Sequence, residues 1–158
     1  LSGDPRTVTA ILTNYQKTVC DEIACLWEKR SNPLILKDKK RQHVPIQLDQ
    51  WITLPAGDTH RFYISSQLTV KGMIYNILLK EAVLNIEYAF ENGKTRQHRF
   101  IRENAKHGLW ISPYTVKPNE DLAKYGKVKA IRFKTSHPQH YEKWIGYWSV
   151  NEFPVEQL

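Results

Sequence analysis

The chain has 158 residues, of which 41% are hydrophobic and 25% are charged, and its formal net charge is +7. This length suits a single domain over residues 1–158 with its own core, and the composition excludes a disordered chain or a fibrous repeat. No apolar run reaches the roughly 18 residues of a membrane-spanning helix, so we expect no span within these residues.

The first predicted element is an amphipathic helix over about residues 6–30. Apolar side chains recur there at intervals of three and four, the spacing of a helix face that packs on a core. They are Val8, Ile11, Leu12, Tyr15, Val19, Ile23 and Leu26. Pro5 suits the start of this helix, and Pro33 disfavours helical geometry at the residue before it.

Cys20 and Cys25 are the two cysteines of the chain. On one helix they would lie about 140° apart around the axis, too far for a disulfide, which predicts two free thiols. If the backbone instead turns between them, a small disulfide loop forms and the compartment is oxidising. We predict no metal site, because no second cysteine pair exists and the HPQH segment, with His137 and His140, is typical of a solvated loop.

From residue 34 to about 153 the period of the hydrophobic pattern changes to two, which predicts half-buried strands. Such stretches surround residues 44–48, 62–70, 128–133 and 144–150. The Pro-Ala-Gly-Asp segment at 55–58 is a turn between the first two.

The sharpest local signal is VLNIEYAFENGKTRQHRFI, residues 83–101, in which an Asn-Gly pair predicts a hairpin turn. A two-residue loop places Arg99 opposite Ile86 on the apolar face. One extra bulged residue at Gly93 turns Phe100 inward instead. In that second register Arg96, His98 and Arg102 turn inward as well. The sequence leaves both registers open.

One helix followed by roughly seven short strands predicts a mainly β protein, a jelly-roll-like β-sandwich with the helix against an edge or a face. We expect the sandwich to span about residues 34–153. No second helical pattern falls between the strands, which argues against parallel β-α-β units and doubly wound nucleotide-binding folds.

Motifs of the common enzyme classes are missing from the sequence, including GxSxG, HExxH and a Gly-rich phosphate loop. Asp38 and Lys40 suit a metal-dependent nuclease only superficially, because they stand in the charge run KDKKRQ with no predicted strand to orient them. We therefore expect a noncatalytic protein without a cofactor.

Positive charge is concentrated in three segments, 28–43, 94–107 and 117–134, each with a net charge of +4. Interleaved aromatic residues such as Trp27 and Phe100 suit stacking on single-stranded bases. The alternative function is therefore a domain that binds an anionic polymer or nucleic acid. Against it, no familiar nucleic-acid-binding motif is visible and lysine-rich loops are ordinary surface features.

The segment HGLWISPY, residues 107–114, sets a Trp and a Tyr beside Gly, Ser and Pro. Leu109 and Ile111 are the natural core pair, so Trp110 should face outward or lie at the sandwich edge. Outward rings stack on sugars while polar neighbours pair with the hydroxyls. The candidate ligand-binding residues are Trp110, Tyr114, Tyr63, Arg99 and Arg102. Core packing is the alternative role of any Trp.

The succession of THRFYISSQLTV, the hairpin, GLWISPY and VKAIRFKTSHP, closed by an aromatic strand, resembles extracytoplasmic jelly-roll modules of the carbohydrate-binding kind. Some of these modules are appended to bacterial membrane glycosyltransferases. The resemblance covers roughly residues 44–150 and leaves out the helix with the two cysteines. It implies a noncatalytic module of a larger envelope protein that binds glycan or cell-envelope polysaccharide on the periplasmic or extracellular face. A cytoplasmic location and a protein-interaction role in a larger assembly are the alternatives, and the oligomeric state stays open.

Overall fold

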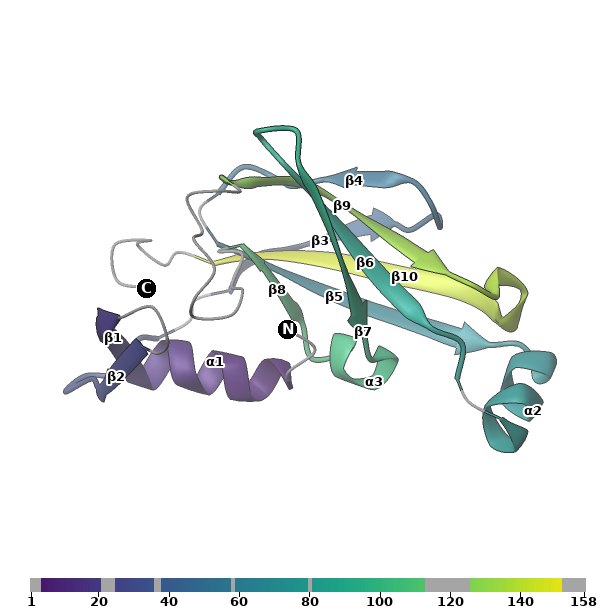
Figure 1. The fold of residues 1–158 in the computed structure, drawn as a ribbon, viewed down its shortest axis with the longest axis horizontal. Coiled ribbons are helices and arrows are strands. Elements are labelled where there is room, and N and C mark those ends of the chain that lie inside the picture. Colours follow the sequence, from purple (N-terminus) through teal and green to yellow (C-terminus); the bar gives the residue numbers. More distant parts are fainter. Residues whose placement is uncertain are drawn as a thin grey trace.

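The computed structural model describes residues 4–20, 25–35, 38–57, 59–79, 81–112 and 126–151. In these residues an N-terminal helix and a two-stranded sheet precede two antiparallel four-stranded sheets (Figure 1). The predicted mainly β fold, with sheets packed as sandwich-like layers, is confirmed. Within the same part of the chain, no helix has the length and apolar character needed to cross a membrane.

Helix α1 (Pro5–Asn14) is shorter than predicted. Asp4 caps its start by accepting a hydrogen bond from the backbone N–H of Arg6 at 3.2 Å, and proline suits the first helical position. Near its end the hydroxyl of Thr13 donates back to the Thr9 carbonyl, a bond that weakly disfavours helix continuation. Tyr15, the first residue after the helix, has an extended backbone, so the predicted helix is wrong beyond Asn14.

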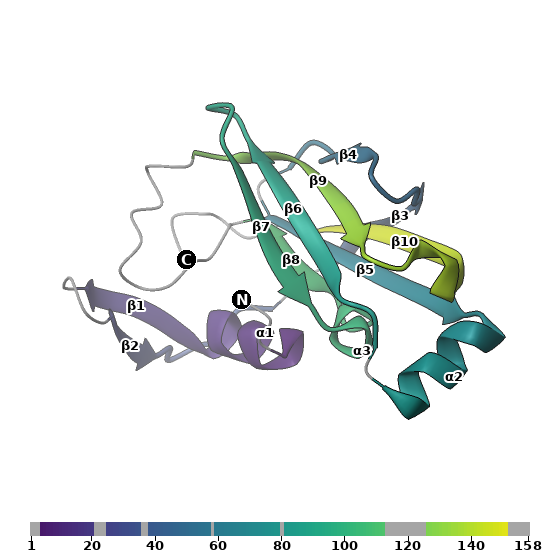
Figure 2. The same cartoon turned by 45° about the vertical axis from the view of Figure 1, so that its right-hand side comes forward.

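The chain continues as a hairpin of β1 (Tyr15–Cys20) and β2 (Cys25–Lys29), which projects from the sandwich at the end opposite helix α2 (Figures 1 and 2). Its register places Cys20 opposite Cys25. The premise of the free-thiol prediction, one continuous helix, is therefore wrong, because both cysteines belong to paired antiparallel strands. The cysteine side chains lie outside the described part of the structure.

Eight strands form the two large sheets. The first sheet has the order β3 (Asp38–Pro45), β10 (Tyr141–Asn151), β5 (Thr59–Leu68) and β8 (Leu109–Ser112), and the second has the order β4 (Trp51–Thr53), β9 (Val128–Thr135), β6 (Leu84–Phe90) and β7 (Thr95–Phe100). All pairings are antiparallel. The charge run KDKKRQ, expected to lie outside any strand, belongs largely to β3 and pairs with β10.

Large aromatic rings contribute to the core between the sheets. Phe62 on β5 packs edge-on against Trp148 at 4.5 Å between ring centroids, and it stacks on Phe133 at 5.4 Å. All three side chains are buried. Gly146 makes this packing possible, because a Cβ there would press on Phe62 and Ile46 at 2.7 Å. The large rings thus join β5, β9 and β10 into one unit.

The hairpin β6–β7 adopts the second of the two registers left open by the sequence. Leu84 pairs with Phe100, and Phe100 is buried. Gly93 has a φ of 82° in a loop closed by a bond from the Phe90 N–H to the Lys94 carbonyl at 3.0 Å. Glycine adopts this left-handed geometry without strain, so the loop can hold one residue more than a two-residue turn. The extra residue reverses which side of the sheet the side chains of β7 face.

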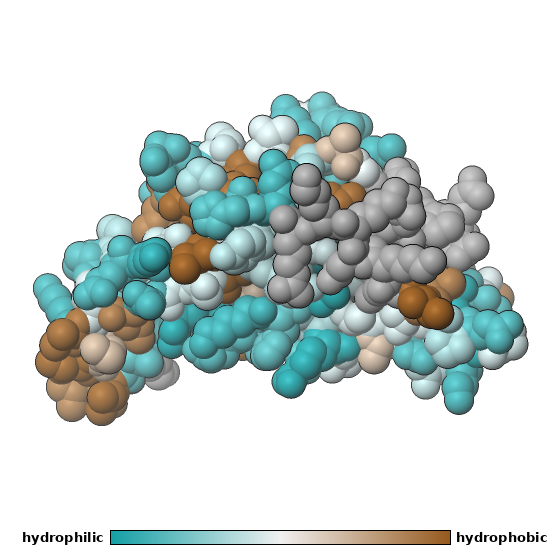
Figure 3. Space-filling model, turned by 180° about the vertical axis from the view of Figure 1, so that it is seen from behind, coloured by the Kyte–Doolittle hydropathy of each residue, from teal (hydrophilic) through white to brown (hydrophobic). Residues whose placement is uncertain are grey.

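Two helices that the sequence pattern did not predict interrupt the strands, α2 (Val70–Leu78) and α3 (Arg102–Ala105). Thr69 caps α2 by accepting a hydrogen bond from the Gly72 N–H at 3.0 Å. Val70 continues the period-two pattern of β5, which led us to place it in the strand. Figure 3 shows α2 as an apolar lobe at the lower left of that view.

Candidate functional site

The outer face of the first sheet carries a row of three rings from adjacent strands. Tyr147 on β10 pairs with His43 on β3 and with Tyr63 on β5. The His43 and Tyr147 rings meet edge-on at 5.3 Å, and Tyr147 is 38% exposed. Successive side chains of a strand point to opposite sides of the sheet. Phe62 and Ile64, the neighbours of Tyr63, point into the core, so Tyr63 lies on the outer face.

The loop that follows α3 packs against the Tyr63 ring. Gly108 has a φ of 89°, and a Cβ at this position would lie 2.8 Å from the Tyr63 ring. The backbone can therefore approach the ring closely only with glycine at position 108. This contact fixes one side of Tyr63 and leaves the ring partly exposed.

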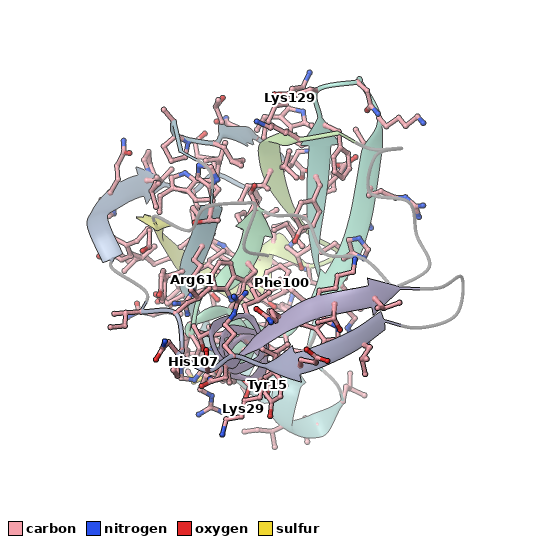
Figure 4. All side chains as sticks on the ribbon, turned by 90° about the vertical axis from the view of Figure 1, so that its left-hand side faces the viewer. Tyr15, Lys29, Arg61, Phe100, His107 and Lys129 are labelled. Carbon is pink, nitrogen blue, oxygen red and sulfur yellow. The ribbon has the colours of Figure 1, made fainter. Side chains whose placement is uncertain are left out.

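Arg61 joins this row to Trp110 on the edge strand β8. Its guanidinium carbon lies 5.2 Å from the centroids of both the Tyr63 and Trp110 rings. Its Nη2 donates to the carbonyl of His107 at 2.9 Å, on the side of the molecule shown in Figure 4. Its Nε is buried without a hydrogen-bond partner in the described part of the chain. Arg61 thus places fixed positive charge beside two rings.

A shallow depression of about 190 Å³ opens on this face. It is lined by Tyr63, Ile64, Ser65, Lys106, Ile145 and Tyr147. Lys106 pairs with Glu103 at 2.7 Å, and this hydrogen bond holds the pKa of the Glu103 carboxyl below its usual value. The depression therefore combines two phenol rings with an ion pair at its border. Such a surface can bind a ring that has one apolar face and polar edges.

Two of the predicted ligand-binding residues, Tyr63 and Trp110, lie on this face. Trp110 faces away from the core as predicted, because Leu109 and Ile111 are buried on either side of it. It is not open, however, since its Nε1 donates to Thr9 of α1 at 3.1 Å. Tyr114 lies outside the described residues.

The other two predicted residues, Arg99 and Arg102, lie away from this face. Arg99 is exposed on β7 of the second sheet, opposite Asn85. Arg102 begins α3, and its Nε donates to Glu81 at 2.6 Å. The Arg102 side chain is only 16% exposed and also contacts Glu103 at 3.2 Å, so its charge is committed to these two ion pairs.

Sequence reasoning did not select Tyr147, Arg61, Lys106 or His43 as ligand-binding residues. Alternation could have found Tyr147, since it sits between Gly146 and Trp148, both of which face the core. Nothing in the local sequence places Lys106 beside Tyr147, because the loop after α3 belongs to a distant part of the chain.

The basic segments do not gather on one surface in the part of the chain that the structure describes. Strand β3 lies beside β4, since both line a depression of about 280 Å³. Strand β7 forms the opposite edge of the sheet that contains β4. The β3 part of the first segment is therefore separated from β7 by the width of the sandwich, and residues 117–125 of the third segment lie outside the described ranges.

Cations of the third basic segment are partly neutralised. Arg132 and Lys134 both contact Glu87 Oε2, at 2.6 and 2.8 Å. Partial burial acts to raise the pKa of Glu87, but hydrogen bonds from Lys134 and Arg132 outweigh it and hold that pKa below its usual value. These charges are thus engaged within the sheet.

Over the described residues, no group of three or more His, Cys, Asp or Glu side chains is placed to hold a metal ion. His137 and His140 stack on each other at 4.9 Å between ring centroids. The His140 ring also lies 4.6 Å from Tyr75 of α2. These histidines therefore help to join α2 to the sheet.

Comparison with known proteins finds no matching family model, no matching curated protein and no matching solved structure.

Proposed function

We propose that the protein is a noncatalytic binding module that holds a sugar ring of a glycan or cell-envelope polysaccharide against Tyr63 and Tyr147. The observation that carries this proposal is the row of rings from His43 to Tyr63 across an open sheet face. Such rings cover the apolar face of a sugar, while Lys106 and Ser65 border the same depression and can pair with its hydroxyls.

The strand order supports a jelly-roll-like version of the sandwich. If β3 is counted as the first of eight strands, the orders β3-β10-β5-β8 and β4-β9-β6-β7 are those expected of two interleaved Greek keys. This topology agrees with the resemblance to extracytoplasmic carbohydrate-binding modules. Cys20 and Cys25 are paired residues of two antiparallel strands, which suits a disulfide, and disulfides persist in oxidising compartments. We therefore propose that the module belongs to a larger envelope protein and lies on the periplasmic or extracellular side.

Affinity electrophoresis in gels that contain cell-envelope polysaccharide, together with a glycan array, tests the proposal. We expect Tyr147→Ala to weaken glycan binding by at least about tenfold, on the scale of one lost stacking contact. Tyr147→Phe should retain most of the binding, because it keeps the ring. Trp51→Ala is the matched control, since Trp51 is similarly exposed, at 41%, but lies on the second sheet.

Equal binding by wild type and Tyr147→Ala would overturn the proposed site. The nucleic-acid alternative makes a different prediction, because phosphate binding weakens steeply as salt rises, whereas ring stacking barely responds. A fluorescent oligonucleotide that binds at micromolar concentration in near-physiological salt, with no glycan bound, would favour that alternative instead.

A further inference from the structure

Helix α2 exposes an unusual amount of apolar surface for so short an element. The exposed side chains are Val70 at 66%, Met73 at 46%, Ile74 at 53%, Ile77 at 82%, Leu78 at 72% and the C-cap residue Leu79 at 64%. Figure 3 shows them as one brown lobe at the end of the molecule. Contiguous patches of this kind on a protein surface mark interaction sites.

The orientation of α2 is fixed by its other side. Thr69 donates its N–H to the carbonyl of His140 at 3.0 Å, and its hydroxyl donates to the carbonyl of Gln139 at 3.2 Å. Gly72 packs so closely on the His140 carbonyl that a Cβ would collide with it. Tyr75 lies against the His140 ring. The helix is thus anchored through Gly72 and Tyr75, and it cannot turn its aliphatic side inward.

The aliphatic side chains form one continuous stripe. At 100° per residue, Val70, Met73, Ile74, Ile77 and Leu78 fall within an arc of roughly 140°. Lys71 lies at the edge of this arc, and the arc itself contains no charged residue. Val70, Ile74 and Ile77 follow the spacing of the seam between two packed helices.

We propose that this stripe, defined by Val70, Met73, Ile74, Ile77 and Leu78, is the interface of a two-fold homodimer in which α2 packs on α2 of a second copy. The exposed fractions of these five residues correspond to roughly 550 Å² on each copy, so a fully covered stripe buries roughly 1,100 Å² in total, which exceeds the about 1,000 Å² expected of a specific interface. A two-fold contact brings the same surface of both copies together, and an uncharged stripe is complementary to itself.

A lipid surface fits this helix less well. Helices that lie on membranes carry lysine and arginine on their polar side and use that side to face water and lipid headgroups. The side of α2 opposite the stripe holds Gly72 and Tyr75 and is turned to the protein body. The dimer goes beyond the proposed glycan binding and does not depend on it.

Sedimentation equilibrium of the chain at roughly 1 to 100 μM tests the dimer, a range in which a standard apolar interface is occupied. We expect the wild type to be dimeric and both Ile74→Lys and Ile77→Glu to weaken association by at least roughly 30-fold. Val19→Lys is the matched control, because Val19 is 65% exposed on β1 at the other end of the molecule, and this variant should remain dimeric.

Two further measurements make the result decisive. Thermal unfolding of Ile77→Glu at a concentration where the wild type is monomeric should match the wild type, since Ile77 is 82% exposed and makes little contact within one copy. Flotation with phosphatidylglycerol vesicles tests the lipid alternative. A wild type that stays monomeric over the whole range overturns the dimer, whether or not it floats with vesicles. Equal loss of the dimer in Val19→Lys and Ile77→Glu overturns the assignment to α2.

Discussion

Trp110 donates its indole N–H to the hydroxyl of Thr9 at 3.1 Å, and this bond joins the edge strand β8 to helix α1 across 101 positions of sequence. The Arg61 guanidinium lies 5.2 Å from the centroid of the same ring. Trp110 therefore holds the N-terminal helix against the sheet, next to the face that carries Tyr63 and Tyr147. Its role is closer to that of a structural clamp than to that of an open platform for a ligand.

Replacing Trp110 should therefore cost stability. We expect Trp110→Ala to lower the free energy of unfolding by about 2 kcal/mol, less than the 3 to 5 kcal/mol of a fully buried Trp, because the ring is partly exposed. This corresponds to a fall of roughly 4 to 8 °C in melting midpoint for a chain of this length. Thermal unfolding followed by circular dichroism measures it.

A double-mutant cycle separates the hydrogen bond from the ring. Trp110→Phe and Thr9→Val each remove the bond and should each cost about 1 kcal/mol, while the double variant should cost little more than either. Fully additive losses would show that Trp110 and Thr9 are not coupled, which would contradict the clamp.

The register of the β1–β2 hairpin predicts a disulfide between Cys20 and Cys25. Opposed residues of an antiparallel pair have α-carbons about 4.5 to 5.5 Å apart, within the range that disulfides span. Thiol titration of the denatured, unreduced protein should therefore count close to zero free thiols, and two after reduction. A count of two without reduction, in protein prepared from an oxidising compartment, would contradict the pairing.

The stability of the protein should fall as the pH drops below about 6.5. Burial, followed by the charges of His137 and Lys71, lowers the pKa of His140 from its usual value of 6.5. Between that lowered pKa and 6.5 the unfolded chain binds a proton that the folded chain does not, so stability rises with pH across this window and is lost as the pH falls.

Urea unfolding of wild type and His140→Phe between about pH 5 and 7.5 checks this, across the titration range of histidine. The phenylalanine keeps a ring against Tyr75 but does not titrate, so its stability should depend less on pH. Parallel curves for the two proteins would show that another group controls the pH dependence.

Glu87 should stabilise the second sheet through its two cations. We expect Glu87→Gln to lower the free energy of unfolding at pH 7 by about 1 to 2 kcal/mol, a modest value because Arg132 and Lys134 remain 24% and 32% exposed. Because the pKa of Glu87 is held below its usual value, this contribution is present above about pH 4.5 and is lost as the pH falls through the lowered pKa.

Urea unfolding at pH 7 and pH 3 measures the contribution of Glu87. The difference between wild type and Glu87→Gln should shrink at the lower pH. Glu142→Gln, at an exposed position, is the control and should change stability by less than about 0.5 kcal/mol. An equal effect of both substitutions would indicate a general charge effect.

Several features of the fold could be predicted from the sequence because their causes are local. An Asn-Gly turn between alternating strands is enough to place the β6–β7 hairpin, and alternation in LWIS is enough to turn Trp110 away from the core. The period-two pattern from residue 34 onward likewise predicted a mainly β protein, because strand faces repeat wherever one side of a sheet is buried.

Other features depend on contacts between distant parts of the chain. The apolar residues at 15–27 have helical spacing, yet β1 and β2 are paired strands on which Val19 and Leu26 are exposed. Spacing alone does not reveal whether a core lies opposite. Helix α2 has helical spacing of its aliphatic residues, but it is short and begins at Val70, which also continues the alternation of β5, so the period-two pattern hid its start.

The candidate site was decided almost entirely by tertiary structure. The sequence marked Tyr63 and Trp110 as surface aromatic residues, but strand pairing placed Tyr147 and His43 beside Tyr63, and the loop after α3 brought Lys106 to the same depression. Local sequence determines which side of a strand a residue faces, because side chains alternate. Which strands become neighbours is determined by the packing of the whole core, and no local pattern contains that information.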